Sequence, residues 1–241
     1  MRTKITSPIY LVTWTLTGSF KMRGVGTACV HAVHQHNARC LVASSGGNAG
    51  QAVAVAGKHL GIPITVFVPA TTSELAINQM RLNGANVQLA GNSLDEAIAA
   101  AKQHVLHTPS AVFIPPFDHP SVFAGNGTIV DEVLQQLQEA NATLHGLMCS
   151  VGGGGLFTGM VERLRALGLV HVPMVAVETE GAASLTASIK ANELVTLEKI
   201  TSIATTLGTK RVASRAFEAA CVQPTFPMTV TDRRVARNDI V

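Results

Sequence analysis

Aromatic and charged residues are both scarce in this chain of 241 residues. Phe, Trp and Tyr make up 4% of it and Asp, Glu, Lys and Arg 14%, whereas hydrophobic residues make up 47%. Disordered chains show the opposite balance, so the composition excludes a largely disordered protein and indicates a globular one. Because aromatics are few, Ala, Val, Ile and Leu must fill the core, which suits parallel strands covered by helices on both faces.

Cysteines are few and far apart. The four of them, Cys29, Cys40, Cys149 and Cys221, form no Cys-x-x-Cys pair. A chain of this size with such spacing is not expected to be held by a disulfide framework. We therefore expect a reducing, cytoplasmic setting.

Basic clusters and long apolar runs are missing as well. The net charge of +3 is scattered along the chain, which argues against a nucleic-acid-binding surface. No segment is long and apolar enough to span a membrane. The run 9–12 follows Arg2 and Lys4 and faintly resembles a signal peptide, but Pro8 and several threonines interrupt it and no clear cleavage site follows. We therefore expect neither a nucleic-acid partner nor a membrane partner.

Strand-like and helix-like segments alternate along most of the sequence. This alternation predicts βαβ units and a parallel α/β fold, in one large domain or two small ones. The capping box of Ser93 and Glu96 opens one of the helices. The other predicted helices are 48–60, 73–82, 125–137 and 156–167, and the predicted strands are 40–43, 64–68, 86–90, 111–114, 146–151, 174–178 and 228–230.

The first chemical motif, TGSFKMRG at 17–24, places Lys21 after a Gly-Ser turn and near the start of a predicted helix. The positive charge of a helix start and the apolar neighbour Phe20 would lower the pKa of this lysine. A lysine of lowered pKa suits covalent Schiff-base chemistry. The alternative is a surface lysine at a helix start, which is the commonest situation of a lysine.

The second motif, SSGGNAG at 44–50, lies at a strand-to-helix turn. Its small residues let the backbone approach a ligand, and the helix start offers N–H groups to an anion such as a carboxylate. Asn48 could donate to a ring hydroxyl or phenolate. The alternative is an ordinary helix capped by Asn48.

The third motif, SVGGGGL at 150–156, has four consecutive glycines between a strand and a helix, which predicts a nest of N–H groups for a phosphate. A dinucleotide-binding loop is the alternative, because Glu178 ends the next strand where a ribose-binding acid would lie. However, the third glycine position of G-x-G-x-x-G is Phe157, and no Gly-Lys-Ser/Thr follows for a Walker loop.

Three histidines, His31, His34 and His36, lie close enough in sequence to suggest a metal site. His31 and His34 would share a helix face, but no carboxylate or cysteine completes the site nearby. The sequence also has no Gly-x-Ser-x-Gly elbow and no HExxH helix.

The three motifs, in this order, resemble those of the pyridoxal-phosphate (PLP) enzymes of the tryptophan-synthase-β fold. The nearest branch is the L-serine dehydratase/L-threonine deaminase family, including the serine-dehydratase-like proteins. Further similarity lies at 115–120, 175–182 and 201–204. The resemblance implies a three-layer α/β protein of fold type II. Its small cofactor and substrate domain would be 15–118, and its large PLP-binding domain would be 1–14 plus 119–241.

The resemblance also implies that this fold is incomplete and truncated at both ends. Family members begin upstream with a strand and a helix. Downstream they carry a Glu-Pro-Ala-Cys-Gly-like segment and a Ser or Cys that meets the pyridine nitrogen. The segment between Tyr10 and Lys21 is expected to be about two residues shorter than in the family pattern.

The roles that the resemblance implies concern four groups of residues. Lys21 and Ser44 would be catalytic, with Lys21 forming the Schiff base and moving the α-proton. The substrate carboxylate would be held by Ser44, Ser45, Gly46 and Ala49. A monovalent cation such as K⁺ would be held by Glu178, Ala182 and Ser184, with the carbonyls of Leu207 and Thr209. The cofactor would be held by Phe20, Lys21, Asn48, Gly152, Gly153, Gly154, Gly155 and Leu156.

The implied activity is that of a PLP-dependent L-serine ammonia-lyase, which turns serine into pyruvate and ammonia and threonine into 2-oxobutanoate. The implied context is amino-acid catabolism and gluconeogenesis, with a small amino acid as substrate and a homodimer as the assembly. Three alternatives stay open. They are a β-replacement or threonine-synthase-type relative, a truncated product with vestigial motifs, and a nucleotide-binding module.

Overall fold

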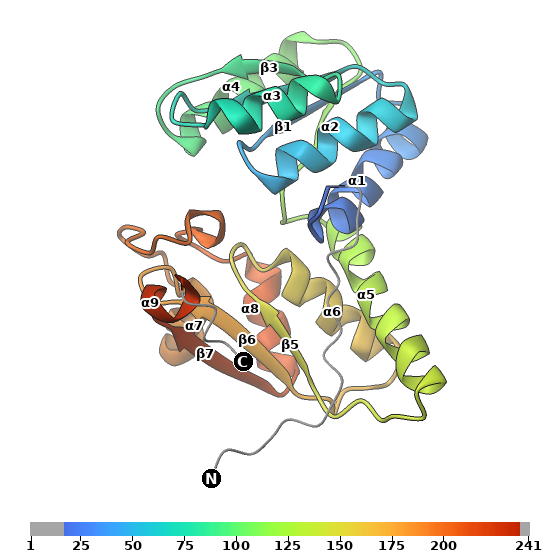
Figure 1. Ribbon diagram of the computed structural model, residues 1–241, viewed down its shortest axis with the longest axis vertical. Coiled ribbons are helices and arrows are strands. Elements are labelled where there is room, and N and C mark those ends of the chain that lie inside the picture. The colour runs from blue at the N-terminus through green and yellow to red at the C-terminus, as the bar shows by residue number, and fades with distance from the viewer. Residues whose placement is uncertain (1–16, 237–241) are drawn as a thin grey trace.

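The computed structural model describes residues 17–236, which form two lobes, each built on its own parallel sheet (Figure 1). The first sheet has the strand order β3-β2-β1-β4 and the second β5-β6-β7. The strands are β1 (Cys40–Ser44), β2 (Ile64–Val68), β3 (Asn86–Leu89), β4 (Ala111–Phe113), β5 (Leu147–Ser150), β6 (Met174–Thr179) and β7 (Thr225–Val230).

Helices connect these strands and cover the sheets. Two of them, α1 and α5, pack side by side where the lobes meet (Figure 1). The helices are α1 (Lys21–His36), α2 (Asn48–Leu60), α3 (Glu74–Leu82), α4 (Leu94–His107), α5 (Pro120–Glu139), α6 (Gly155–Ala166), α7 (Ser184–Ala191), α8 (Ser214–Val222) and α9 (Asp232–Ala236), with a 3-10 turn η1 (Thr205–Leu207).

The first sheet carries helices on both faces, as the aromatic-poor composition predicted. Side chains alternate between the two faces of a strand. Leu41 and Ala43 therefore pack in one core with α1, α2 and α3. Val42 and Phe67 pack in a second core with α4. Because β1 and β2 are buried on both sides, their sequences are nearly continuous apolar runs, interrupted by Thr65 and ended by Ser44.

On the second sheet, the helices of the described residues pack against one face. Cys149, Met174 and Ala176 share a core with α6, α7 and α8. The residues that alternate with them form two rows across the strands, Met148–Val175–Phe226 and Ser150–Val177–Met228. In these rows Met148, Phe226 and Met228 are 57%, 59% and 44% exposed. We call Met148, Val175, Val177, Phe226 and Met228 the outer face of the second sheet.

Two predicted boundaries differ from the observed ones by about three residues or more, and the others differ by less. Helix α5 begins at Pro120 rather than at 125, because the His119 ring nitrogen Nδ1 accepts the N–H of Ser121 at 3.2 Å and proline is favoured in the first turn. Strand β7 begins at Thr225 rather than at 228, and it includes Pro227, which an edge strand tolerates. By contrast, α2 and β2 have the predicted bounds.

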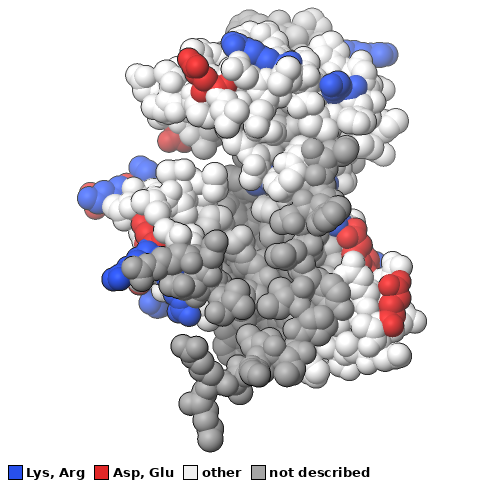
Figure 2. All heavy atoms as spheres, in the orientation of Figure 1, with Lys and Arg blue, Asp and Glu red and all other residues white. Residues whose placement is uncertain are grey.

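The predicted domain boundary at 118/119 falls between β4 and α5 and stays a prediction. The run 9–12 and the segment 1–14 lie outside the described residues, as does most of the segment between Tyr10 and Lys21. Within residues 17–236, no helix is long and apolar enough to cross a membrane. On the face seen in Figure 2, Lys and Arg lie in separate groups, several of them beside Asp or Glu.

Candidate active site

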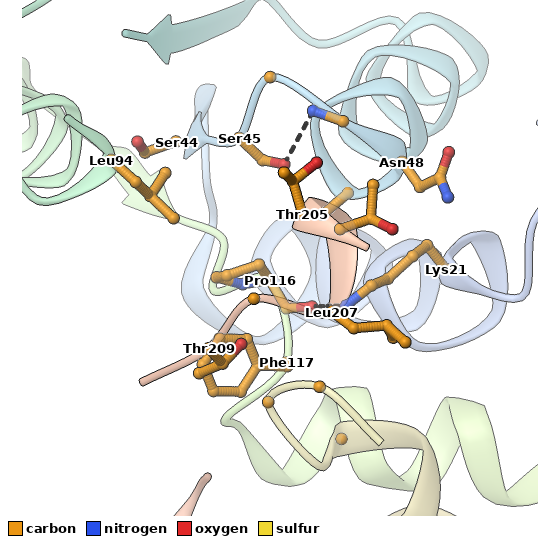
Figure 3. A pocket seen from close by; sticks show the side chains of 18 of the residues that line it. Lys21, Ser44, Ser45, Asn48, Leu94, Pro116, Phe117, Thr205, Leu207 and Thr209 are labelled. Atoms are coloured by element: carbon orange, nitrogen blue, oxygen red, sulfur yellow. Dashed lines mark hydrogen bonds between the residues drawn. The ribbon is translucent and has the colours of Figure 1, made fainter. Parts of the chain in front are cut away.

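A cavity of about 540 Å³ lies at the carboxyl ends of β1, β2, β4 and β5. The loops that follow these strands line it, together with Phe20, Lys21 and the segment Thr205–Thr209 (Figure 3). In parallel α/β proteins, ligands bind outside the carboxyl ends of the strands. All three sequence motifs therefore contribute to one cavity, although they are up to about 130 residues apart.

Lys21 is the first residue of α1 and faces this cavity. Its Nζ donates to the carbonyl oxygen of Pro116 at 2.7 Å (Figure 3). The ring centroids of Phe20 and Phe117 lie 5.4 and 6.0 Å from Nζ. Burial among these groups lowers the pKa of Lys21 from 10.5 to about 8. The predicted direction of the pKa shift is therefore confirmed, and burial is its cause.

The second motif forms the turn from β1 into α2. Ser44 ends β1 and is 2% exposed, and its Oγ is buried with no hydrogen-bond partner among the described residues. The Oγ of Ser45 accepts the N–H of Gly47 at 3.2 Å. Gly47, not Asn48, is the N-cap of α2, and no side chain caps this helix. The alternative of a helix capped by Asn48 is therefore wrong, because the chain turns one residue earlier.

The third motif forms the turn from β5 into α6. Gly154 is the N-cap of α6, with φ at +88° and no side-chain cap, and its backbone lies directly against Ala216 and Val212. Gly153 and Gly155 pack equally closely against Phe117, so a Cβ fits at none of the three. This turn needs glycines for space as well as conformation. The first N–H groups of α6 have no acceptor within the helix and can bind an anion.

Of the residues proposed for a cation, Glu178, Ala182 and Ser184 are absent from the cavity lining, whereas Leu207 and Thr209 belong to it. Glu178 is fully buried, and its carboxylate accepts the N–H of Leu185 at 2.9 Å and the N–H and Oγ of Thr186 at 2.7 and 2.6 Å. Burial raises the pKa of this carboxyl group, and the three donors oppose the shift. The carboxylate thus caps the start of α7. Because its oxygens already accept these three hydrogen bonds, the structure does not favour a ribose-binding role for Glu178. Ala182 is buried too, and the buried Oγ of Ser184 has no partner in the described residues.

Two of the three histidines of α1, His31 and His36, lie near His119 at the start of α5. The His31 ring centroid lies 5.2 Å from that of His36 and 6.5 Å from that of His119, while His34 is exposed. Within residues 17–236, no group of three or more His, Cys, Asp or Glu side chains is arranged to hold a metal ion.

Several residues of the cavity were not predicted from the sequence. Pro116 and Phe117 follow β4, and their contacts with Lys21 come from a turn more than 90 residues away in the chain. Their position after a strand of the parallel sheet was the available signal. The other unpredicted lining residues are Pro69, Thr71, Thr72, Ser73, Leu94, Thr205, Thr206 and Gly208.

Known proteins are similar to this chain in sequence and in fold. The L-serine dehydratase/L-threonine deaminase of Mus musculus is 42% identical over 217 residues, which are 90% of this chain and 65% of that protein. The serine dehydratase-like protein of Homo sapiens is 44% identical over 207 residues, 86% of this chain and 61% of that protein. The chain therefore spans less than two thirds of the length of these relatives.

Among solved structures, a fungal L-serine ammonia-lyase from Rhizomucor miehei superposes with a TM-score of 0.84 at 33% identity. The superposition covers 92% of this chain and 69% of that one. The predicted α/β fold type is therefore confirmed. Residues 13–237 also match the sequence profile described as "Pyridoxal-phosphate dependent enzyme". Since this match covers most of the sequence, the chain belongs to the family of pyridoxal-phosphate dependent enzymes.

Proposed function

We propose that the protein is a PLP-dependent L-serine ammonia-lyase, which converts L-serine into pyruvate and ammonia and accepts L-threonine as a second substrate. One observation carries the proposal. A buried lysine of lowered pKa shares one cavity with two strand-to-helix turns whose helix starts are open to anions. The names of the relatives above, serine dehydratase and threonine deaminase, support the choice of substrates.

The residues present fit the cofactor. A phosphate group fits the N–H groups at the start of α6, where Gly152, Gly153, Gly154, Gly155 and Leu156 would hold it. Lys21 would bind the aldehyde carbon, and Phe20 and Asn48 would contact the ring. When bound, PLP supplies an electron sink for the substrate's α-carbon.

Lys21 would do two things in the reaction. Its neutral amine carries the lone pair that bonds to the aldehyde carbon, and its pKa of about 8 makes this form available near neutral pH. Once the substrate amine has displaced it, the same Nζ would take the proton from the substrate Cα. Phe20 and Phe117 would keep water away from this nitrogen.

The turn at 44–49 would bind the substrate. The start of α2 has no side-chain cap, so its N–H groups can hold the substrate carboxylate beside Ser45, Gly46 and Ala49. The unpartnered Oγ of Ser44 would complete that contact. With the carboxylate fixed, the β-hydroxyl would leave with a proton as water. The enamine that remains would take a proton at its β-carbon to become an imine, and addition of water to the imine carbon would release ammonia and pyruvate.

We also propose that a monovalent cation such as K⁺ binds at Glu178, Ala182 and Ser184, with the carbonyls of Leu207 and Thr209. The support is the buried, unpartnered Oγ of Ser184, whose neighbour Leu185 donates its N–H to the buried carboxylate of Glu178. If the proposal holds, activity rises with K⁺ in place of Li⁺, and Ser184→Ala lowers the response. An equal rate in both salts would contradict it.

The remaining proposals concern the cell and the assembly. We propose a cytoplasmic enzyme of amino-acid catabolism that supplies gluconeogenesis, supported by four free cysteines and by the resemblance. We propose a homodimer on the resemblance alone, and sedimentation of the purified protein tests it.

A product assay tests the main proposal. Purified protein incubated with PLP and L-serine should release pyruvate and ammonia in equal amounts. Lys21→Ala should lower the rate by at least about 10³-fold, because it removes both the covalent bond and the base. Lys58→Ala, an exposed lysine of α2, is the control that should leave the rate unchanged. NAD binding without any pyruvate would favour the nucleotide-binding alternative instead.

A further inference from the structure

One wall of the cavity is a segment that belongs to neither sheet. Thr205, Thr206, Leu207, Gly208 and Thr209 line the cavity, and Thr205, Leu207 and Thr209 surround it with the motif residues in Figure 3. The turn η1 and the irregular residues beside it form this wall. Leu207 packs directly against Gly152, the first glycine of the third motif. A displacement of the wall would therefore reach the glycine turn as well.

The carboxylate of Asp232 binds the residues that directly precede this wall, although Asp232 lies 30 residues after Ser202 in the chain. Its Oδ1 accepts the hydroxyl of Ser202 at 2.7 Å, and its Oδ2 accepts the N–H of Ile203 at 3.0 Å. The Oγ of Ser202, in turn, accepts the N–H of Ala204 at 3.0 Å. These bonds engage residues 202, 203 and 204, which directly precede the lining residue Thr205. Ser202 is 7% exposed, so water replaces its lost bond poorly.

We propose that Asp232 is a positioning residue of the cofactor site, which sets the affinity for PLP by holding the wall 205–209 in place. The proposal rests on the proposed function, since it deepens the account of the same cavity. Asp232 itself is absent from the cavity lining and would touch neither cofactor nor substrate. Its effect passes through Ser202 and Ile203 to the wall, and from Leu207 to Gly152.

The side chain of Asp232 suits this task for a chemical reason. A carboxylate accepts two hydrogen bonds at once, and bonds to a charged acceptor are about twice as strong as neutral ones. An Asn at this position keeps one oxygen acceptor and, through rotation of the Ser202 hydroxyl, can donate a neutral bond. An Ala keeps neither bond. Asp232→Ala should therefore weaken the affinity for PLP more than Asp232→Asn does.

The test is a titration of the full chain with PLP, in which the visible absorption of the lysine-bound cofactor reports how much is bound. Asp232→Ala should weaken the affinity about tenfold, and Asp232→Asn should weaken it by less. Ser202→Ala should also weaken it, and Ser202→Ala combined with Asp232→Ala should be no worse than Asp232→Ala alone. Arg233→Ala, at the adjacent exposed position, is the matched control and should bind like the wild type.

At saturating PLP, the variants should recover most of kcat, because the affected quantity is binding rather than the chemical step. Equal PLP affinity in Asp232→Ala and the wild type would overturn the proposal. So would a loss of kcat at saturation with unchanged affinity. If Asp232→Ala fails to fold, Ser202→Ala and Asp232→Asn decide the outcome.

A second measurement separates this proposal from the proposed function. Hydrogen exchange of the cofactor-free chain should be faster at 203–208 in Asp232→Ala than in Arg233→Ala. If the wild type binds no PLP at all, the proposed function fails, and with it the positioning role. The exchange result then still shows whether Asp232 anchors the wall. If the wild type binds PLP but exchange and affinity do not change in the variants, only the positioning role fails.

Discussion

The Nζ of Lys21 lies near two aromatic rings, those of Phe20 and Phe117, and donates a hydrogen bond to the carbonyl oxygen of Pro116. A carbonyl and two ring faces replace water incompletely, so the charged ammonium is disfavoured and the pKa falls to about 8. At pH 7, about a tenth of the molecules therefore hold this lysine as a neutral amine.

The lowered pKa predicts how the reaction of Lys21 with PLP depends on pH. Only the neutral amine reacts, and its fraction rises with pH, so the rate should climb through a midpoint of about 8 and then level off. Stopped-flow absorbance at a series of pH values measures this rate. A rate that keeps climbing toward pH 10.5, the ordinary lysine value, would show that Lys21 is not buried as described.

For single residues, the sequence was sufficient to single out Lys21 but did not predict most of the residues that surround it. The motif around Lys21 predicted a lysine of lowered pKa from local helix-end charge and from Phe20, whereas burial is the cause in the structure. Phe117 and Pro116, which complete its burial, come from a distant turn; the family resemblance included the segment 115–120 but implied no role for these two residues. The carboxylate of Glu178 shows the same limit, since its hydrogen bonds are to the first turn of α7, a helix that no sequence pattern predicted.

The start of α6 is the element on which the proposed phosphate site depends. Gly154 adopts a left-handed conformation there, and its Cα faces Ala216 of α8 at close range. Gly168, just after the same helix, has a similar φ of +75°, but open space surrounds it. Substitutions at the two glycines therefore distinguish the cost of backbone strain, which both share, from the cost of steric overlap, which only Gly154 has.

Substitution of these glycines should give different results. Gly168→Ala should cost about 1 kcal/mol of unfolding free energy, from strain alone, and leave PLP affinity unchanged. Gly154→Ala should cost at least about 1 kcal/mol more, because the added Cβ displaces α8 or α6, and it should abolish PLP binding. Urea unfolding and PLP titration measure both. Equal losses of stability with intact PLP binding would contradict the described geometry.

Elements with strong local signals were predicted well. Gly61 ends α2 in a left-handed conformation, and the capping box of Ser93 and Glu96 begins α4, so the sequence marks both boundaries. Helix α5 was predicted too short because its N-cap is His119, a residue outside the usual set of capping residues. Helices α7 and α8 were not predicted. Their stability comes from a buried carboxylate and from packing on α6, which are long-range effects.

At the scale of the whole molecule, the alternation of strands and helices predicted parallel sheets. The meeting of loops from both sheets around one cavity is a tertiary feature, which the carboxyl-edge rule only suggests. The outer face of the second sheet was also not predicted. Alternation along β5 and β6 leaves one face apolar, and the described helices cover the other.

Large exposed apolar patches bind hydrophobic dyes and promote association. We therefore expect Phe226→Thr to lower the fluorescence of a bound naphthalene sulfonate dye and to raise the solubility limit. Leu82→Thr is the control, because Leu82 is 79% exposed on α3, away from this face. Equal dye binding by the wild type and Phe226→Thr would mean that the outer face is covered in solution.

The central claim is that Lys21 is the residue that binds PLP. Reduction of the PLP-treated chain with borohydride fixes the cofactor on the lysine that holds it, and peptide mass mapping identifies that lysine. We expect one pyridoxyl group per chain, on Lys21, and none in Lys21→Ala. A pyridoxyl group on another lysine, or equal labelling of the Lys21→Ala variant, would contradict the account.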